Sequence, residues 1–184
     1  MKYINVPGLY NSGADHWQTK WEELHKADFI RVNQDNWIYA YKRHWVQRLQ
    51  QVIASVNEPM ILIGHSLGCI TIRHWLNEFD NPLVKAVFLV APADVENSRL
   101  EGLCTFAPIP NTPIAVDGYL IASTNDPYAA VDRAATWSAY WGTRFISLGN
   151  KGHINANSNL GNWEEGWNLL QELTEHAKFR RQTA

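Results

Sequence analysis

The sequence has few cysteines, no long apolar run and no excess of either charge, and each lack excludes a class of protein. Two cysteines, Cys69 and Cys104, are too few for a disulfide-rich secreted scaffold. Cys69 falls in an apolar stretch, so we expect a buried free thiol there. The longest apolar runs, around Met60–Ile63 and Ala86–Ala91, are far shorter than the about 20 residues that span a bilayer.

The charge pattern gives no indication of a nucleic acid or an anionic membrane as partner. Lys and Arg number 16 against 18 Asp and Glu, the net charge is −2, and both signs are spread along the chain. Pro7 and Gly8 interrupt the first apolar segment too early for a signal peptide. We therefore expect a cytoplasmic protein whose partner is a small molecule, without nucleic acid or membrane binding.

Neither an internal repeat nor a Gly/Ser linker divides the chain, so we predict one domain over residues 1–184. Short apolar, β-branched runs alternate with longer segments of helical period. This alternation predicts an α/β fold: a doubly wound, mostly parallel sheet of about six strands with helices on both faces. The predicted strands are Tyr3–Val6, Phe29–Val32, Met60–Ile63, Ala86–Val90, Tyr119–Ala122 and Phe145–Leu148. The predicted helices are Asp15–His25, Ile38–Ser55, Leu67–Glu78, Tyr128–Trp141 and Trp163–Lys178.

Two further features concern the segments between and within these elements. Residues 92–117 contain several prolines and are expected to run over the surface and shape the substrate site, with a short helix near Glu96–Leu103. Among nine tryptophans, pairs recur four residues apart on predicted helices, which favours core packing over ligand binding.

One predicted strand leads directly into a Gly-x-Ser-x-Gly run, Gly64-His65-Ser66-Leu67-Gly68, and a helical segment follows. A nucleophile on a tight strand-to-helix turn has a strained backbone, and glycines two residues to either side supply the room that it needs. The free amides of the following helix favour negative charge beside the hydroxyl. This context predicts that Ser66 is a nucleophile, whereas His65 points elsewhere and is expected to be structural.

A serine nucleophile needs a base, and on this kind of turn the chain order is serine, acid, histidine. His153 follows the last predicted strand and is therefore expected at the carboxyl edge of the sheet, where such sheets bind ligands. His74 and His176 fall on predicted helices, away from that edge. His153 is thus the predicted base.

The acid that orients this base has two candidates at the carboxyl edge, Asp126 and Asp94. Asp126 follows the penultimate strand and is favoured because it lies nearer to His153 in the expected strand order. An aspartate before Pro127 also suits a helix N-cap, and one residue can fill both roles.

Acyl transfer also needs amides for the developing oxyanion, and these are predicted at Leu67 and Leu9. Tyr10, His16 and Trp17 follow in the same loop and helix and are expected to line the substrate pocket. The loop around Leu9 lacks the Lys-Ser/Thr of a nucleotide-binding loop, and no cluster has metal-ligand spacing. We therefore expect neither a metal nor another cofactor.

In these motifs the chain resembles the small serine hydrolases grouped with the retinoblastoma-binding protein 9 and the bacterial YdeN-like proteins. The matching segments are Pro7-Gly8-Leu9, Asn11-Ser12-Gly13, Asp15-His16-Trp17-Gln18, Gly64-His65-Ser66-Leu67-Gly68, Ser123-Thr124-Asn125-Asp126-Pro127-Tyr128 and Gly152-His153-Ile154-Asn155. The resemblance implies a minimal α/β-hydrolase fold without a large lid domain, and a triad of Ser66, Asp126 and His153. The Leu-x-Cys-x-Glu motif of the vertebrate member is not seen, so that protein partnership does not carry over.

Three functions remain open on the sequence. The first is a carboxylesterase-like serine hydrolase that cleaves small carboxylic esters through an acyl-enzyme on Ser66. The second uses the same triad on amides or small peptides, since a protonated histidine can deliver its proton to oxygen or nitrogen. The third is a non-catalytic interaction protein on a hydrolase scaffold.

Overall fold

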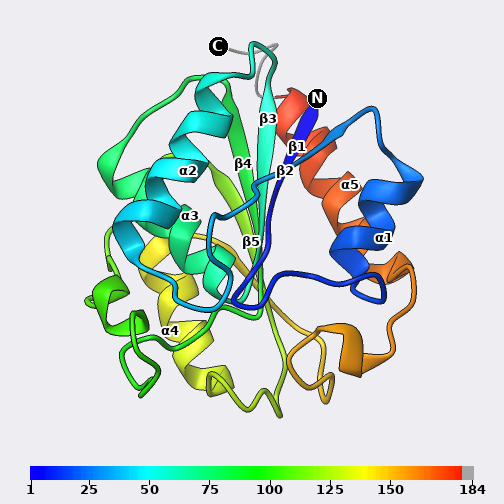
Figure 1. Cartoon of the computed structure of the whole chain (residues 1–184). Helices are drawn as coiled ribbons and strands as arrows, with labels where there is room; N and C mark the ends of the chain where they lie inside the picture. The colour runs from blue at the N-terminus through cyan, green and yellow to red at the C-terminus, as the bar shows by residue number, and fades with distance from the viewer. Residues whose placement is uncertain (180–184) are drawn as a thin grey trace.

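A sheet of six parallel strands forms the centre of the computed structural model, which describes residues 1–179 (Figure 1). In chain order the strands are β1 (Lys2–Val6), β2 (Phe29–Arg31), β3 (Met60–His65), β4 (Val84–Val90), β5 (Asp117–Ala122) and β6 (Arg144–Ser147). They lie side by side in the order β2-β1-β3-β4-β5-β6, and each neighbouring pair is parallel. Residues 180–184 of the predicted domain lie outside the described residues.

Helices cover both faces of this sheet (Figure 1). One face carries α1 (Trp17–Leu24) and α5 (Glu164–Phe179). The other carries α2 (Lys42–Ala54), α3 (Leu67–Glu78) and α4 (Val131–Trp141). Because both faces are covered, the central strands are continuous apolar runs, and all six residues of β3 are buried. The two resulting hydrophobic clusters, one on each face, confirm the predicted doubly wound α/β fold.

The strand order reverses beside β1, because β2 pairs with one of its edges and β3 with the other. Where the order of a parallel sheet reverses, the loops after the two central strands diverge and leave a crevice at their carboxyl ends. Here those loops follow β1 and β3, and they contain Leu9 and Ser66. The topology therefore places the crevice at the predicted nucleophile.

The short helix predicted near Glu96–Leu103 is wrong. Turns, bends and irregular backbone occupy residues 96–102, and a single turn of 3-10 helix, η1 (Leu103–Phe106), begins at the last residue of the range. The carboxylate of Asp94 accepts the backbone N–H of Glu96, and the hydroxyl of Ser98 accepts that of Leu100. Such local side-chain bonds compete with helical hydrogen bonding, so the segment folds as turns.

The tryptophan pairs pack in the core, as the spacing predicted. The rings of Trp17 and Trp21 lie 4.6 Å apart, and Trp163 lies 5.0 Å from the first and 5.6 Å from the second. The indole N–H of Trp17 donates to the carbonyl of Ile154 at 2.8 Å. This bond ties α1 to the segment that follows His153.

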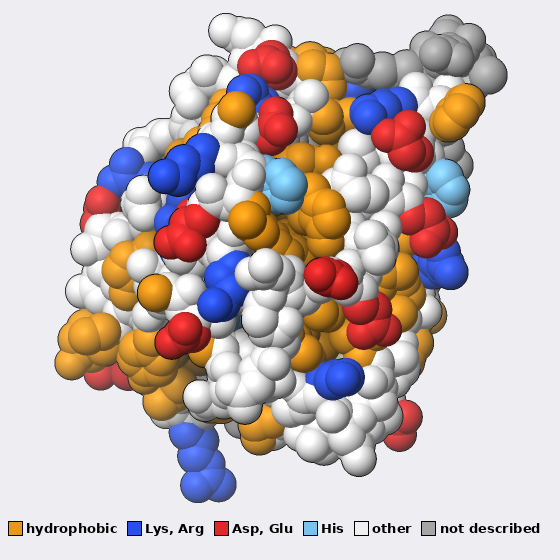
Figure 2. Space-filling view, turned by 90° about the vertical axis from the view of Figure 1, so that its right-hand side faces the viewer, with side chains coloured by type: hydrophobic (Ala, Val, Ile, Leu, Met, Phe, Trp, Pro, Cys, Tyr) orange, Lys and Arg blue, Asp and Glu red, His pale blue; other side chains and the backbone are white. Residues whose placement is uncertain are grey.

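Charged side chains of both signs are interspersed on the face that α1 and α5 cover (Figure 2). None of the helices in residues 1–179 combines the length and apolarity needed to cross a bilayer.

Candidate active site

Ser66 lies on a sharp turn between β3 and α3, with φ 54° and ψ −121°. A non-glycine residue in this region is strained and persists only where its surroundings hold it. Here the Ser66 amide donates to the Val90 carbonyl at 3.0 Å, and its own carbonyl accepts the Cys69 amide at 3.0 Å. The turn is therefore fixed from both sides, as a nucleophile elbow requires.

Gly64 and Gly68 are needed on this turn because backbone atoms crowd both positions. A Cβ on Gly68 would lie 2.0 Å from the Val6 carbonyl oxygen, and one on Gly64 would lie 2.8 Å from the Cys69 nitrogen. The spacing of the motif thus reflects close packing of the turn against β1 and α3.

Solvent reaches this part of the chain at one residue. From Met60 to Trp75, each residue is buried except Ser66, which is partly exposed. Ser66 is therefore accessible from a cavity, while its neighbours along the chain are buried.

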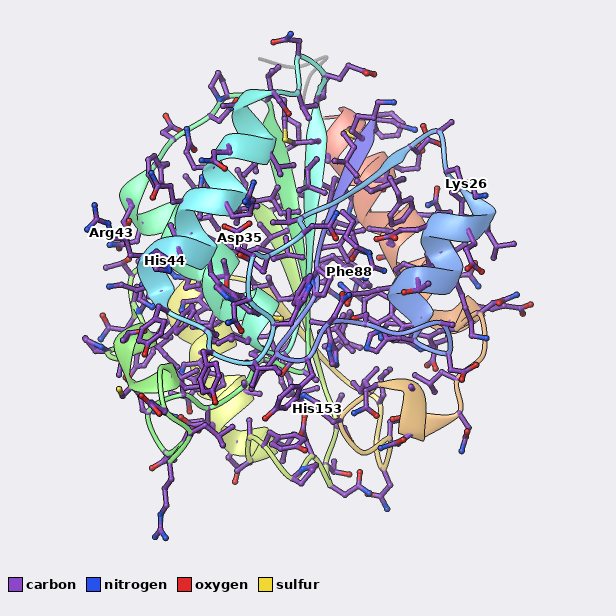
Figure 3. The ribbon with its side chains drawn as sticks, viewed as in Figure 1. Lys26, Asp35, Arg43, His44, Phe88 and His153 are labelled. Carbon is purple, nitrogen blue, oxygen red and sulfur yellow. The ribbon has the colours of Figure 1, made fainter. Side chains whose placement is uncertain are left out.

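His153 and Asp126 form a buried pair at the carboxyl edge, where His153 lies below the ends of the strands (Figure 3). The Nδ1 atom of His153 is 2.9 Å from both carboxylate oxygens of Asp126, and the two side chains are 8% and 3% exposed. Because a carboxylate only accepts, Nδ1 carries the proton and the Nε2 lone pair is left to act as a base. The structure thus brings together the predicted base and its favoured acid.

Asp126 does not cap α4, which begins five residues later than its position, at Val131. Its carboxylate instead accepts the backbone N–H of Tyr128 at 2.9 Å, within the turn that begins with Pro127. The rival acid, Asp94, forms an ion pair with Arg133 at 3.4 Å. Asp94 lies at the same edge, where its carboxylate accepts from the Glu96 amide and the Asn97 side chain and pairs with Arg133 instead of His153.

The two predicted oxyanion amides lie on either side of the nucleophile. Leu67 is the first residue of α3, so its N–H has no acceptor within the helix. Gly8 packs against the turn so closely that a Cβ there would lie 2.8 Å from the Ser66 Cβ and 3.4 Å from the Leu67 nitrogen. Leu9, the next residue, lines the same cavity as Ser66 and Leu67.

Two further histidines surround the base. The Nε2–H of His65 donates to the backbone carbonyl of His153 at 2.9 Å, so the residue before the nucleophile holds the segment that carries the base. The ring of His16 lies 4.6 Å from that of His65. Its Nδ1 accepts the backbone N–H of Gln18, so His16 caps the N-terminus of α1. Burial lowers the pKa of His16 to about 3, aided by electrostatic interactions with Arg31 and His153. Burial also holds the pKa of His65 well below its usual value, so both rings are neutral near pH 7.

A cavity of about 630 Å³ opens over Ser66 and His153. Tyr10 and His16 line it, together with both predicted oxyanion residues. Trp17 does not, because its indole is turned into the core, where it is 1% exposed and bonded to Ile154. Residues 93–103 of the long excursion form part of the wall, so that segment shapes the site as expected.

Tyr128 was given no role by the sequence, yet its ring stands edge-on to that of His153 with centroids 4.5 Å apart. Its position two residues after the acid is the one signal that points to it. Within residues 1–179, no three His, Cys, Asp or Glu side chains gather as metal ligands.

Comparison with known proteins gives a consistent picture. Residues 3–172 match the model of the serine hydrolase family. A comparison with curated protein sequences gives no match. A YdeN-like hydrolase from Pectobacterium atrosepticum is similar in structure, with a TM-score of 0.86 and 32% identity over 96% of this chain and 91% of that chain.

More distant structures share the fold. The ydeN gene product of B. subtilis has a TM-score of 0.80 and 17% identity, over 95% of this chain and 100% of that chain. A monoacylglycerol lipase from Paleococcus ferrophilus has a TM-score of 0.70 and 12% identity, over 95% of this chain and 94% of that chain. The predicted minimal α/β-hydrolase fold is therefore confirmed.

Proposed function

This chain belongs to the serine hydrolase family, as a small member of the YdeN-like type, and on that basis we propose that it hydrolyses small carboxylic esters. The reaction proceeds through an acyl-enzyme on Ser66. The observation that carries the proposal is the buried His153–Asp126 pair beside the same cavity into which the strained turn presents Ser66.

In the first half of the reaction, Nε2 of His153 accepts the Ser66 hydroxyl proton as the oxygen attacks the ester carbonyl. Asp126 holds the imidazole in the required tautomer and stabilises its positive charge. The negative charge on the carbonyl oxygen is received by the amides of Leu67 and Leu9. The protonated His153 then gives its proton to the leaving alcohol oxygen, and the acyl-enzyme forms.

In the second half, a water molecule replaces the alcohol. His153 removes a proton from that water, which attacks the acyl carbonyl, and the same two amides receive the charge. Return of the proton to the Ser66 oxygen releases the acid. The buried and neutral His16 and His65 add no competing charge beside the base.

The cavity wall supports an uncharged substrate. Apolar and aromatic side chains, such as those of Leu9, Leu100 and Leu103, form about half of the wall, and neither Lys nor Arg is among the described residues that line it. Asp94, the charged carboxylate in the wall, is paired with Arg133. An anionic ester would therefore find no cation in this cavity.

Labelling with a fluorophosphonate tests the nucleophile. We expect the folded protein to be labelled at Ser66 and the Ser66→Ala variant to remain unlabelled and inactive. Turnover of p-nitrophenyl esters compared with aminoacyl amides then tests the leaving group. A folded protein that takes no label and hydrolyses neither series would contradict the proposal and favour an interaction protein on a hydrolase scaffold.

The same reasoning extends to location. We propose a cytoplasmic protein, which is supported by the free thiols of Cys69 and Cys104.

A further inference from the structure

A second hollow of about 590 Å³ adjoins the main cavity. Ser66, Leu9 and Leu67 line only the main cavity, whereas the residues that line both spaces are Pro127, Tyr128, His153, Asn155 and Asn157. The hollow therefore lies on the side of the base, away from the nucleophile and the oxyanion amides. We refer to it below as the base-side hollow.

The wall of the base-side hollow differs chemically from that of the main cavity. Its asparagines are Asn125, Asn150, Asn155 and Asn157. Asn155 and Asn157 also line the main cavity, whereas Asn125 and Asn150 line the hollow alone. Leucines and alanines line the main cavity, and none is among the described residues that line the hollow. The two spaces thus suit different halves of one substrate.

Three of these amides are held in fixed orientations by their own oxygens. Oδ1 of Asn125 accepts the Gly152 amide at 2.8 Å, and Oδ1 of Asn150 accepts the Thr124 hydroxyl at 2.6 Å. Oδ1 of Asn155 accepts the backbone N–H of Asn157 at 3.0 Å.

Each of these oxygens is used within the loops, so the NH₂ groups are the parts left for a ligand. Among residues 1–179 no acceptor is found for the Nδ2 groups of Asn125, Asn150 and Asn155. An amide nitrogen carries two N–H donors. The hollow is therefore rich in oriented donors that match the oxygens of hydroxyl groups.

Tyr128 adds an aromatic surface to this donor set. Its side chain is 59% exposed although it stands against His153. An exposed ring beside amide donors suits a ligand with apolar C–H faces and polar edges, as in a sugar or glycerol. Lys151 is the charged residue of the wall and is exposed, as Asn125 and Asn150 are, but hydrogen bonds fix those two amides in place.

The reaction decides which half of the substrate enters the hollow. The leaving oxygen must come within hydrogen-bond reach of His153, so the alcohol leaves on the side of the base. We propose that the base-side hollow binds the alcohol half of the ester, and that this alcohol is an uncharged polyol such as glycerol or a sugar. The proposal rests on the ester hydrolysis proposed above.

The test compares two esters with the same acyl group, 1-butanoylglycerol and propyl butanoate, which differ by the two free hydroxyls. We expect wild-type kcat/KM to be about tenfold higher for the glyceryl ester, as befits one or two neutral hydrogen bonds. Asn150→Asp keeps the oxygen that accepts Thr124 and removes the N–H donors. It is expected to lower the glyceryl-to-propyl ratio about fivefold.

Asn36→Asp is the matched control, because it adds the same charge at an exposed position outside both spaces and keeps the oxygen that accepts the Ile38 and Tyr39 backbone N–H groups. It is expected to leave the ratio unchanged. Asn150→Ala repeats the test without a new charge, and thermal melting shows that each variant is folded.

An equal wild-type rate on both esters, or a ratio that Asn150→Asp and Asn150→Ala leave unchanged, would overturn the inference. A preference confined to a glycerol phosphate ester would also overturn it, since Lys151 would then select an anion. If Ser66 takes no fluorophosphonate label and neither ester is cleaved, the proposed hydrolysis itself fails, which is a separate result.

Discussion

Asp126 and Asp94 lie at the same edge of the sheet but serve different partners. Asp126 bonds to the base, whereas Asp94 bonds to Arg133 on α4. We expect Asp126→Asn to lower kcat about 10⁴-fold, because an amide favours the wrong imidazole tautomer. Asp94→Asn removes an equal charge and is the control, with an expected loss below about tenfold. Ester turnover measures both, and the reverse order would show that the acid is misassigned.

Gly8 and Gly13 lie in one loop but differ in their surroundings. A Cβ on Gly8 would press on the Ser66 Cβ at 2.8 Å, whereas one on Gly13 would meet nothing within 4 Å. We expect Gly8→Ala to displace the Leu9 amide and lower kcat about 100-fold, the cost of one oxyanion donor. Gly13→Ala should retain nearly full turnover. Equal activities of the two variants would contradict the role given to Leu9.

At the level of elements, α1 holds the segment that carries His153, the proposed base. Its Trp17 donates to the Ile154 carbonyl, one residue beyond His153. We expect Trp17→Phe to lower kcat as well as stability, because the ring stays buried while the bond to that loop is lost. Trp75→Phe is the control, since it removes an indole bond of 2.7 Å to Gln50 between α2 and α3, away from the site. Measuring kcat at temperatures below the unfolding transition separates the effect on catalysis from the effect on stability. Equal losses of kcat in Trp17→Phe and Trp75→Phe would contradict a specific role of α1.

The elements that the sequence predicts best are those with one dominant signal. The predicted α3, Leu67–Glu78, agrees with the structure at both ends, because a glycine turn precedes it and apolar residues fill it. The predicted helix at Ile38–Ser55 begins later, at Lys42, after a segment of bends. The helix near Glu96–Leu103 fails because side chains there bond to their own backbone, which periodicity does not register.

The candidate site likewise has residues that the sequence predicts and contacts that only the structure shows. Chain order and position after the strands point to His153 and favour Asp126, but they leave Asp94 as a second candidate. The choice against Asp94 depends on Arg133, which approaches it from a helix about 40 residues along the chain and is visible only in three dimensions. The edge-on contact of Tyr128 with His153 and the oriented asparagine amides depend on the same tertiary packing.

For the whole molecule, the buried neutral histidines link stability to pH. The folded pKa of His16 is about 3 against 6.5 for the free side chain, so the unfolded chain binds the proton first as the pH falls. This contribution is fully present above about pH 6.5 and is lost toward about pH 3, with about 2 kcal/mol of it lost between about pH 7 and about pH 5. Burial lowers the pKa of His65 and His74 as well, and both act in the same direction.

Urea unfolding at about pH 7 and about pH 5 measures this linkage. His16→Asn removes the titrating ring and keeps an oxygen for the Gln18 amide at the start of α1. We expect its loss of unfolding free energy over this range to be about 2 kcal/mol smaller than that of the wild type. His44→Asn, at an exposed position, is the control. If the unfolding free energy of His16→Asn falls as much between these pH values as that of the wild type, the burial of a neutral His16 is contradicted.

The parallel sheet has one further consequence, which concerns handling of the protein. β1 begins and α5 ends at the edge of the molecule opposite the carboxyl ends of the strands, where Ser66 and His153 lie (Figure 1). A bead, fluorescent tag or fused carrier joined to either end is thus held on the far side from the cavity mouth. We expect the immobilised protein to keep the ester turnover that it has in solution.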